Sequence, residues 1–459
     1  MATRTVKELN ATTFDILNAI RNSASANYRD YVPTADPEAN NIKEIGNIIM
    51  NYQALQNEFL NALINRIGLV IITSKGYTNP WQMFKMGKLD YGESIEEIFV
   101  NLAEPFVYDP ETAESTVFKR EIPDVRAAFH YVNYQTFYKE TIQQKDIEKA
   151  FLTIDGVRNL MNKIIDSMFA SANYDEFNVM KYLLAKNILN GRLYPVQISS
   201  VSAANAKGIV STIKGVSNDL TFMNRKYTPT GVATHTPKNE QYLIVNSEFD
   251  SIIDVEVLAS AFNMDKAEFD GRRVLVDSFG SLDTTRLAKL LGDNYEALTS
   301  DEITALNSVP AVLVDKEWFM IFDRTNYFTD LFNGEGLYWN YWYHVWKVFS
   351  SSPFKNAIVF AVGAPSITSV TVTPSAVTAM AGQNVQLSAE VVTAYFASKA
   401  VNWTATIDGA ATDLVSVSPL GEVHLSDELD PETEITVTAT SVLDSTKYDS
   451  CTITIPAEE

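Results

Sequence analysis

Residues of the types that most often perform chemistry are few in this sequence and stand far apart. Its histidines are His130, His235, His344 and His424, and its single cysteine is Cys451. None of them stands at the spacing at which His and Cys side chains share a metal ion. The sequence also has no GxSxG nucleophile elbow, phosphate-binding P-loop, dinucleotide fingerprint or HExxH motif. We therefore predict no catalytic residue, no cofactor and no metal site, and we expect a structural or binding protein and not an enzyme.

Two weaker candidates for chemistry remain. Glu96 and Glu97 are adjacent carboxylates, but such a pair in a charged stretch is normally solvated. His344 stands among aromatic residues, where we expect it to be packed or to donate a hydrogen bond at an interface. A catalytic dyad formed by residues distant in sequence stays open, because only tertiary geometry reveals one.

The densest group of aromatic side chains is the run GLYWNYWYHVWKVF at 336–349. Six Tyr and Trp rings fall within the nine positions 338–346. One face of a strand or helix cannot bury so many rings, so we expect contacts with more than one partner element. A buried core strand or helix and a carbohydrate-stacking surface are the alternative interpretations. The predicted subunit-interface residues in this run are Tyr338, Trp339, Tyr341 and Trp342.

A second aromatic segment, NPWQMFKMGKLDYGES at 79–94, is basic and punctuated by glycine, and has no helical period. It predicts a long β-hairpin or an extended, protruding loop. Its rings must be buried somewhere, and the sequence leaves two alternatives: local packing and a neighbouring subunit. The predicted subunit-interface residues in this segment are Trp81, Phe84, Lys85, Lys88 and Tyr91.

The charge balance is acidic throughout the chain, with a formal net charge of −21. The residues from Ala364 onward hold only Lys399 and Lys447 against 13 acidic residues. Such a chain lacks the overall basic surface of a tight nucleic-acid binder. One cysteine permits no intrachain disulfide, which favours folding in the cytoplasm. No run of about 18 apolar residues predicts a membrane-spanning helix, and the N-terminus has no signal-peptide pattern.

The body of the chain, before Ala364, mixes helical and strand patterns. Residues 1–40 are interrupted by prolines and are interpreted as an arm. From Asp155 apolar residues recur at helical spacing, which predicts a helix over 155–190. About 30 helical residues in this range would span about 45 Å. Strand and helix signals then alternate through the strand AVLVD at 311–315. This order predicts an α+β fold.

The last part of the chain, 364–459, has a different character. Short stretches alternate Val, Ile and Thr with polar residues, and Gly and Pro separate them. The segments at 370–374, 415–417 and 435–440 are examples. This period of two residues predicts a compact all-β sandwich attached to the body.

Several blocks resemble the major capsid proteins of small podoviruses that infect Gram-positive bacteria. The longest are VLVDKEWFM at 312–320 and GLYWNYWYHVW at 336–346. Further blocks fall in the same order along the body: NAIRNS at 18–23, IEEI at 95–98, the equally long VFKREIPDV at 117–125, TIQ at 141–143 and AFNM at 261–264.

This resemblance implies the Hong Kong 97-type capsid fold for residues 1–363. Residues 1–40 then correspond to the N-terminal arm, 75–110 to an extended loop over a neighbour, and 155–190 to the spine helix. Residues 190–350 would contribute most of the axial domain. The segment 364–459 is similar to bacterial immunoglobulin-like (Ig-like) group 2 domains, through VxVxP ending at Pro374, Trp403 and Gly421.

The function that the resemblance implies is that of a bacteriophage major capsid protein. Such a protein is made in the host cytoplasm and assembles with copies of itself, as hexamers and pentamers, into the virion head around double-stranded DNA. The implied partners are a scaffolding protein, the portal, head decoration proteins and, through non-specific contact, the DNA, with no membrane. The alternative is a cell-surface or glycan-binding protein that acts through the Ig-like domain.

Overall fold

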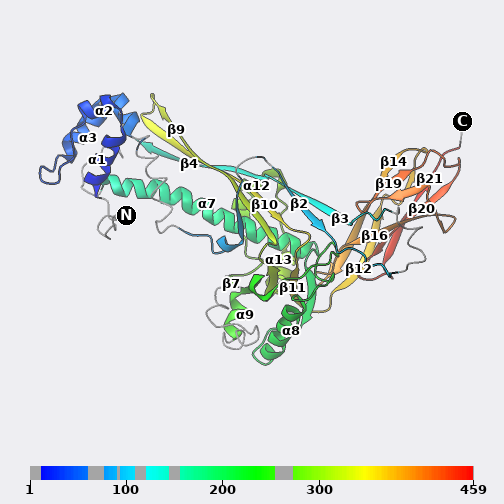
Figure 1. Ribbon diagram of the computed structural model, residues 1–459. Helices are drawn as coiled ribbons and strands as arrows, with labels where there is room; N and C mark the ends of the chain where they lie inside the picture. The colour runs from blue at the N-terminus through cyan, green and yellow to red at the C-terminus, as the bar shows by residue number, and fades with distance from the viewer. Residues whose placement is uncertain are drawn as a thin grey trace.

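The computed structural model describes residues 12–59, 62, 77–89, 92, 94–108, 120–143, 156–253 and 272–457, with backbone alone at 156–165 and 411. The molecule is elongated (Figure 1). Helices near the N-terminus lie at one end, the C-terminal strands lie at the other, and one long helix runs along the part between them.

The N-terminal residues form packed helices. These are α1 (Thr13–Ser23), α2 (Ala26–Tyr31) and α3 (Ile42–Asn51). Thr12 and Asp15 form a capping box that satisfies the first turn of α1. Ile20 and Tyr28 are almost completely buried, so α1 and α2 belong to the hydrophobic core. The described part of the arm expected at 1–40 is therefore folded into helices, because its apolar residues recur at helical spacing between the prolines.

The centre of the body is a four-stranded sheet with a long helix, α7 (Gly156–Leu189), packed along it. The strand order is β1-β9-β10-β4, and the bounds are β1 (Lys85–Lys88), β4 (Tyr134–Gln143), β9 (Phe319–Asn333) and β10 (Tyr338–Ser351). The short 3-10 helix η3 (Gln82–Phe84) precedes β1. The helix expected at 155–190 is thus present, at almost the same bounds.

A separate two-stranded ribbon stands between β1 and β4 in sequence. It pairs β2 (Ser94–Val100) with β3 (Val125–Tyr131) in antiparallel register. Figure 1 shows the ribbon extending from the four-stranded sheet toward the C-terminal strands. The described part of the loop expected at 75–110 therefore belongs to two structures, since β1 is a strand of the central sheet and β2 is a strand of the ribbon.

A five-stranded mixed sheet forms the rest of the body, in the order β5-β11-β8-β6-β7. Its central strand β8 is the predicted strand at 311–315, and all five of its residues are buried. Two hydrophobic clusters cover the two faces of this sheet. The strands are β5 (Tyr194–Ile198), β6 (Gln241–Asn246), β7 (Arg273–Val276), β8 (Ala311–Asp315) and β11 (Ala357–Val362). The helices around them are α8 (Ala206–Asp219), η4 (Lys238–Glu240), α9 (Ser247–Ile252), α12 (Thr284–Leu291), η5 (Gly292–Asn294) and α13 (Ser300–Asn307).

The C-terminal region is all β, and it has a hydrophobic core of its own that runs from Ile367 to Ile455. Its sheets have the orders β13-β21-β20-β16-β17, β14-β19-β18 and β12-β15. The strands are β12 (Ser366–Thr373), β13 (Ala376–Thr378), β14 (Asn384–Gln386), β15 (Ser388–Ala394), β16 (Val401–Ile407), β17 (Ala410–Ala411), β18 (Val415–Val417), β19 (Glu422–Leu425), β20 (Glu434–Ser441) and β21 (Tyr448–Thr454).

Candidate assembly surfaces

The aromatic run at 338–346 is a strand whose residues alternate between two environments. Trp339, Tyr341 and Tyr343 are buried, and the Tyr343 ring lies 4.8 Å from the ring of Phe169 on α7. Successive residues of a strand point to opposite faces, so the residues between them lie on the side away from α7. One face of the run therefore packs into the core, and the other face points away from α7.

The second face of the sheet carries large apolar side chains that the described residues leave largely uncovered. We call this surface the open face and define it by Phe137, Tyr327, Leu331, Trp342 and Trp346. Phe137, Tyr327 and Leu331 are 56%, 61% and 64% exposed. Lys139 places its ammonium 5.6 Å from the centre of the half-buried Trp342 ring.

The predicted interface residues in this run divide accordingly. Trp339 and Tyr341 are core residues, 1% and 2% exposed, and are not available to a neighbour. Tyr338 and Trp342 are half-buried and lie on the side of the open face. The sequence showed that one face could not bury every ring, but it did not say which rings would be inside.

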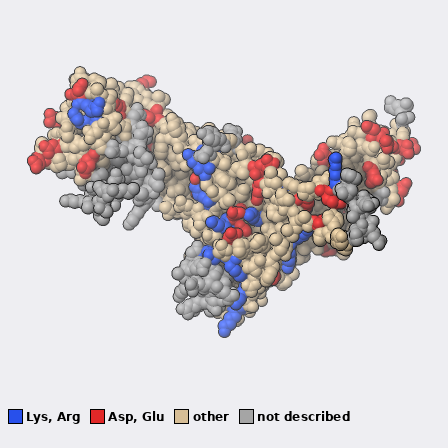
Figure 2. All heavy atoms as spheres, in the orientation of Figure 1, with Lys and Arg blue, Asp and Glu red and all other residues tan. Residues whose placement is uncertain are grey.

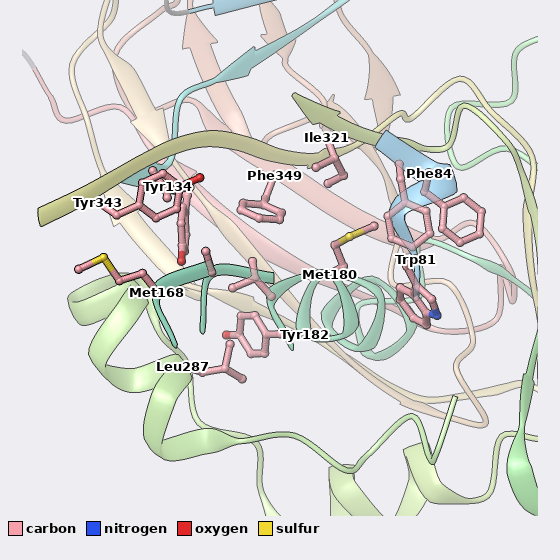
Figure 3. Close-up of a cluster of buried hydrophobic side chains, with 14 of the residues drawn as sticks. Trp81, Phe84, Tyr134, Met168, Met180, Tyr182, Leu287, Ile321, Tyr343 and Phe349 are labelled. Atoms are coloured by element: carbon pink, nitrogen blue, oxygen red, sulfur yellow. The ribbon is translucent and has the colours of Figure 1, made fainter. Parts of the chain in front are cut away.

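Trp81 and Phe84 also lie inside the chain's own core. They are 0% and 1% exposed, and Phe84 packs 4.8 Å from the ring of Phe319. Figure 3 shows both rings within the hydrophobic cluster, on the side of Met180 and Ile321. Local packing, one of the two alternatives that the sequence left open, is the one found. Their prediction as subunit contacts is corrected, because a ring enclosed by its own chain cannot touch a second one.

The basic residues of this segment have different surroundings. Lys85 is half-buried in an ion-pair cluster, whereas Lys88 is exposed at the end of β1. Tyr91 lies outside the described residues. Lys88 is therefore the one predicted contact among the described residues of 79–94 that is exposed.

The cluster around Lys85 joins α7 to the central sheet. Lys85 Nζ lies 3.1 Å from Glu176 Oε2 and 2.7 Å from Asp323 Oδ2. Lys347 is paired with the same two carboxylates, at 2.9 Å from Asp323 Oδ1. Asn79 donates to Glu176 Oε1 at 2.7 Å. Helical and strand periodicity did not reveal this cluster, because its members come from four separate segments.

The opposite charges around Asp323 and Lys85 hold these two groups in their ionised states. Burial acts to raise the pKa of Asp323, but the ammonium groups of Lys347 and Lys85 outweigh it and hold the pKa below its ordinary value. Burial likewise acts to lower the pKa of Lys85, and the carboxylates of Glu176 and Asp323 raise it instead. Each charge therefore depends on its partners.

A second buried contact fixes α7 from another side. Asp175 accepts hydrogen bonds from Arg286 Nε at 2.5 Å and Nη2 at 2.8 Å, a bidentate pair between α7 and α12. Tyr138 of β4 also donates to Asp175, at 2.8 Å. The long helix is thus locked to both the central sheet and the helix beside it.

The ribbon carries the second exposed apolar surface. We call it the outer face of the ribbon and define it by Ile98, Val100, Val125, Phe129 and Tyr131. Each of these side chains is between 51% and 61% exposed. They alternate with inward residues on both strands, so they share one side of the ribbon.

The inner side of the ribbon rests on its own chain. His130 lies 2.7 Å from Ser350 Oγ through Nδ1 and 3.2 Å from Glu97 Oε2 through Nε2. Phe99 stacks on Phe354, with ring centroids 5.6 Å apart. The ribbon is therefore held to the body by one face, and only its outer face is open to a partner.

Glu97 and His344, two of the remaining candidates for catalysis, contact other side chains of the chain. Glu97 takes part in the His130 contact, and the ring of His344 lies 5.7 Å from that of Phe137 on the open face. Within the described residues, no group of three or more His, Cys, Asp or Glu side chains could hold a metal ion. No helix in this part of the chain is long and apolar enough to span a membrane.

Comparison with known proteins relates the chain to phage capsids. Residues 17–361 match the family of Phi29-like phage major capsid proteins. The major capsid protein of Bacillus phage B103 is 35% identical over 405 residues, covering 87% of this chain and 84% of the relative. The major capsid protein of Bacillus phage PZA is 33% identical over 432 residues, covering 93% and 89%.

A solved structure supports the fold. A chain from the capsid of Staphylococcus phage Andhra superposes with a TM-score of 0.51 at 15% identity, covering 64% of this chain and 86% of that one. The family match and the sequence relatives favour the structural over the surface-binding alternative. The chain belongs to the family of Phi29-like phage major capsid proteins and is a structural subunit of a virion capsid.

Proposed function

We propose that neighbouring subunits of this capsid join by placing the outer face of one ribbon against the open face of the next subunit's central sheet. The observation that carries this proposal is the exposed apolar side of the ribbon, at more than half exposure for every residue that defines it. Contiguous exposed apolar patches on soluble proteins mark contact sites, and a shell subunit meets copies of itself on several sides.

The two surfaces fit each other in chemistry. The outer face of the ribbon offers Ile98, Val100 and Phe129, and the open face offers Phe137 and Trp342. Burying an apolar side chain of this size contributes about 1.5–3 kcal/mol. A few such side chains on each of many identical contacts are enough to hold a closed shell.

The buried ion pairs supply a rigid base for this contact. Lys347 and Asp323 lie on β10 and β9, the two strands that carry most of the open face. Lys347 also pairs with Glu176 of α7, and this contact fixes the sheet on the helix. A surface that does not deform on contact loses less conformational entropy when a partner binds.

We assign the segments to the Hong Kong 97-type capsid fold as follows. Helix α7 is the spine helix, the five-stranded sheet with its helices is the axial domain, and the ribbon of β2 and β3 is the extended loop. Compared with the range 75–110 expected from the sequence, the loop begins later and returns later. Hexamers and pentamers of this subunit would then close the head, and Tyr338, Trp342 and Lys88 remain candidate contacts.

We assign residues 364–459 to the Ig-like group 2 class. Support comes from the antiparallel pairings of this region around a core of its own, and from Trp403 and Gly421, which lie in contact. A Cβ on Gly421 would lie 3.1 Å from the Trp403 ring and 2.4 Å from the Leu387 carbonyl oxygen, so only glycine fits there.

The remaining partners are proposed from charge and from the family. Figure 2 shows acidic groups across the C-terminal end of this face, while Lys and Arg gather nearer the middle. A net charge of −21 suits weak, non-specific contact with packaged double-stranded DNA, which has to leave the head again. A scaffolding protein, the portal and head decoration proteins complete the proposed set of partners.

The test is a charge placed in the proposed contact. Phe129→Asp and Ile98→Asp should prevent shell formation while the unassembled subunit keeps its thermal unfolding midpoint. Leu420→Asp, at an 85% exposed position in the C-terminal region, is the matched control and should assemble normally. Electron microscopy and sedimentation of the expressed particles measure the outcome. Normal shells from both ribbon variants would contradict the proposed contact.

A further inference from the structure

The C-terminal region touches the body through a short turn at 395–398, between β15 and β16. Phe396 is 7% exposed and belongs to the hydrophobic core of the body. The next residue, Ala397, is 0% exposed and belongs to the core of the C-terminal region. Two adjacent side chains therefore connect two separate hydrophobic cores.

Two glycines of the body leave the space in which this turn sits. A Cβ on Gly191, just after α7, would lie 2.4 Å from the Ala397 carbonyl oxygen and 2.9 Å from Ser398 Cα. A Cβ on Gly363, at the junction between the two regions, would lie 2.4 Å from the Tyr395 ring. At Gly191 the atoms in the way are backbone atoms, so that position requires a residue with no side chain. At Gly363 the half-exposed Tyr395 ring would have to move away to make room for a side chain.

The turn itself has a backbone conformation that needs support. Tyr395 and Phe396 have φ values of +53° and +62°, in the left-handed region that non-glycine residues seldom adopt. Two such residues in succession persist only where surrounding contacts hold them. Here the buried Phe396 ring and the close fit at Gly191 are those contacts.

We propose that the turn at 395–398 is a docking element that locks the C-terminal region onto the body, with Gly191 and Gly363 as its seat. The C-terminal region is then a fixed part of the shell surface and not a module on a flexible tether. Every subunit presents it at the same angle to α7, so any partner that recognises the particle meets a regular array of these domains.

The chain offers matched controls for the two glycines. Gly231 has the same φ as Gly191, +64°, and Gly87 has a φ of +137° against +142° for Gly363. No atom lies within 4 Å of a Cβ built at Gly231 or Gly87. An alanine at Gly231 or Gly87 therefore adds backbone strain alone, whereas an alanine at Gly191 or Gly363 adds the collision with the turn as well.

The experiment compares Gly191→Ala and Gly363→Ala with Gly231→Ala and Gly87→Ala. In particles imaged by electron cryomicroscopy, the first two should keep a sharp body and lose density for 366–457, and the controls should keep both. In the unassembled subunit, amide hydrogen exchange across 188–194 and 394–398 should speed up at least about tenfold in the first two alone. Phe396→Ala should act like the seat variants.

Three results would overturn the proposal. One is a wild-type particle in which the C-terminal region takes several orientations relative to the body. Another is seat variants that behave like their controls, and the third is equal loosening in all four glycine variants, which would assign the effect to backbone strain. Hydrogen exchange needs no shell, so this test stands even if the proposed contact between subunits fails.

Discussion

Lys347 of β10 and Glu176 of α7 form a buried ion pair across 171 positions of sequence, and this pair joins the strand that carries the open face to the long helix. The side chains are 7% and 2% exposed. With Lys85 and Asp323 they make a closed group of two positive and two negative charges. Lys347 and Glu176 are nearly inaccessible to water, so water cannot readily take the place of either one.

Removing one charge from this group should be costly. Lys347→Met leaves a buried carboxylate uncompensated, and we expect the free energy of unfolding of the unassembled subunit to fall by about 3–5 kcal/mol. Lys355→Met is the control, since its pair with Glu317 is more exposed and contributes about 0–1 kcal/mol. Urea unfolding measures both, and equal losses would contradict the role of the buried group.

The same group predicts a dependence on pH. The folded-state pKa of Asp323 lies below its ordinary value of about 3.9, so its contribution to stability is complete above that value and disappears as the pH falls through the folded pKa. Asp323→Asn should therefore lower the urea midpoint at neutral pH and lose its effect toward about pH 2. Asp408→Asn, at an exposed position, should differ little from wild type at any pH. A constant deficit for Asp323→Asn across the range is the contrary outcome.

Substituting two tryptophans of β10, one at a time, should affect folding in one case and assembly in the other. Trp339 is 1% exposed in the core, so Trp339→Ala should reduce the free energy of unfolding by about 3–5 kcal/mol. Trp342 lies on the opposite face, so Trp342→Ala should change unfolding little and reduce the yield of shells. Thermal unfolding of the subunit and sedimentation of particles give the two readouts. Similar effects of both substitutions on unfolding would be inconsistent with the open face as a contact.

Deletion of 364–459 tests how independent the C-terminal region is. Its strands have their own core, so the shortened chain should still fold and assemble. Because Phe396 leaves the core of the body in that deletion, the remaining chain should also lose up to about 3 kcal/mol of stability. Calorimetry and electron microscopy of the shortened protein check both parts. An unfolded body would show that the two regions are one folding unit.

The sequence predicted those elements whose signal is local. Helix α7 appears at the bounds that its apolar spacing indicated, and β8 is the buried strand expected at 311–315. The period-2 pattern after Ala364 likewise produced strands. In each case the pattern repeats over many residues, so neighbouring segments do not have to be known.

The candidate contacts were harder to predict because they depend on distant partners. Trp81 is buried against Phe177 and Phe319. These partners are distant in sequence, so the segment 79–94 alone does not predict that the ring is buried. On β10 the alternation was visible, but no local signal tells which face α7 covers. The ribbon's outer face was missed because Phe129 and Ile98 are ordinary strand residues until pairing places them side by side.

The pairing of β9 with β10 has a mechanical consequence. Fourteen residue pairs from Tyr338 to Ser351 connect the two strands in a long antiparallel ladder, with one shift of register between Trp346 and Lys347. A force directed along these strands loads the ladder in shear, so many backbone hydrogen bonds must fail together before the strands slide. Outward pressure inside the head would stretch its subunits in the plane of the shell wall. The hairpin of β9 and β10 would resist such stretching.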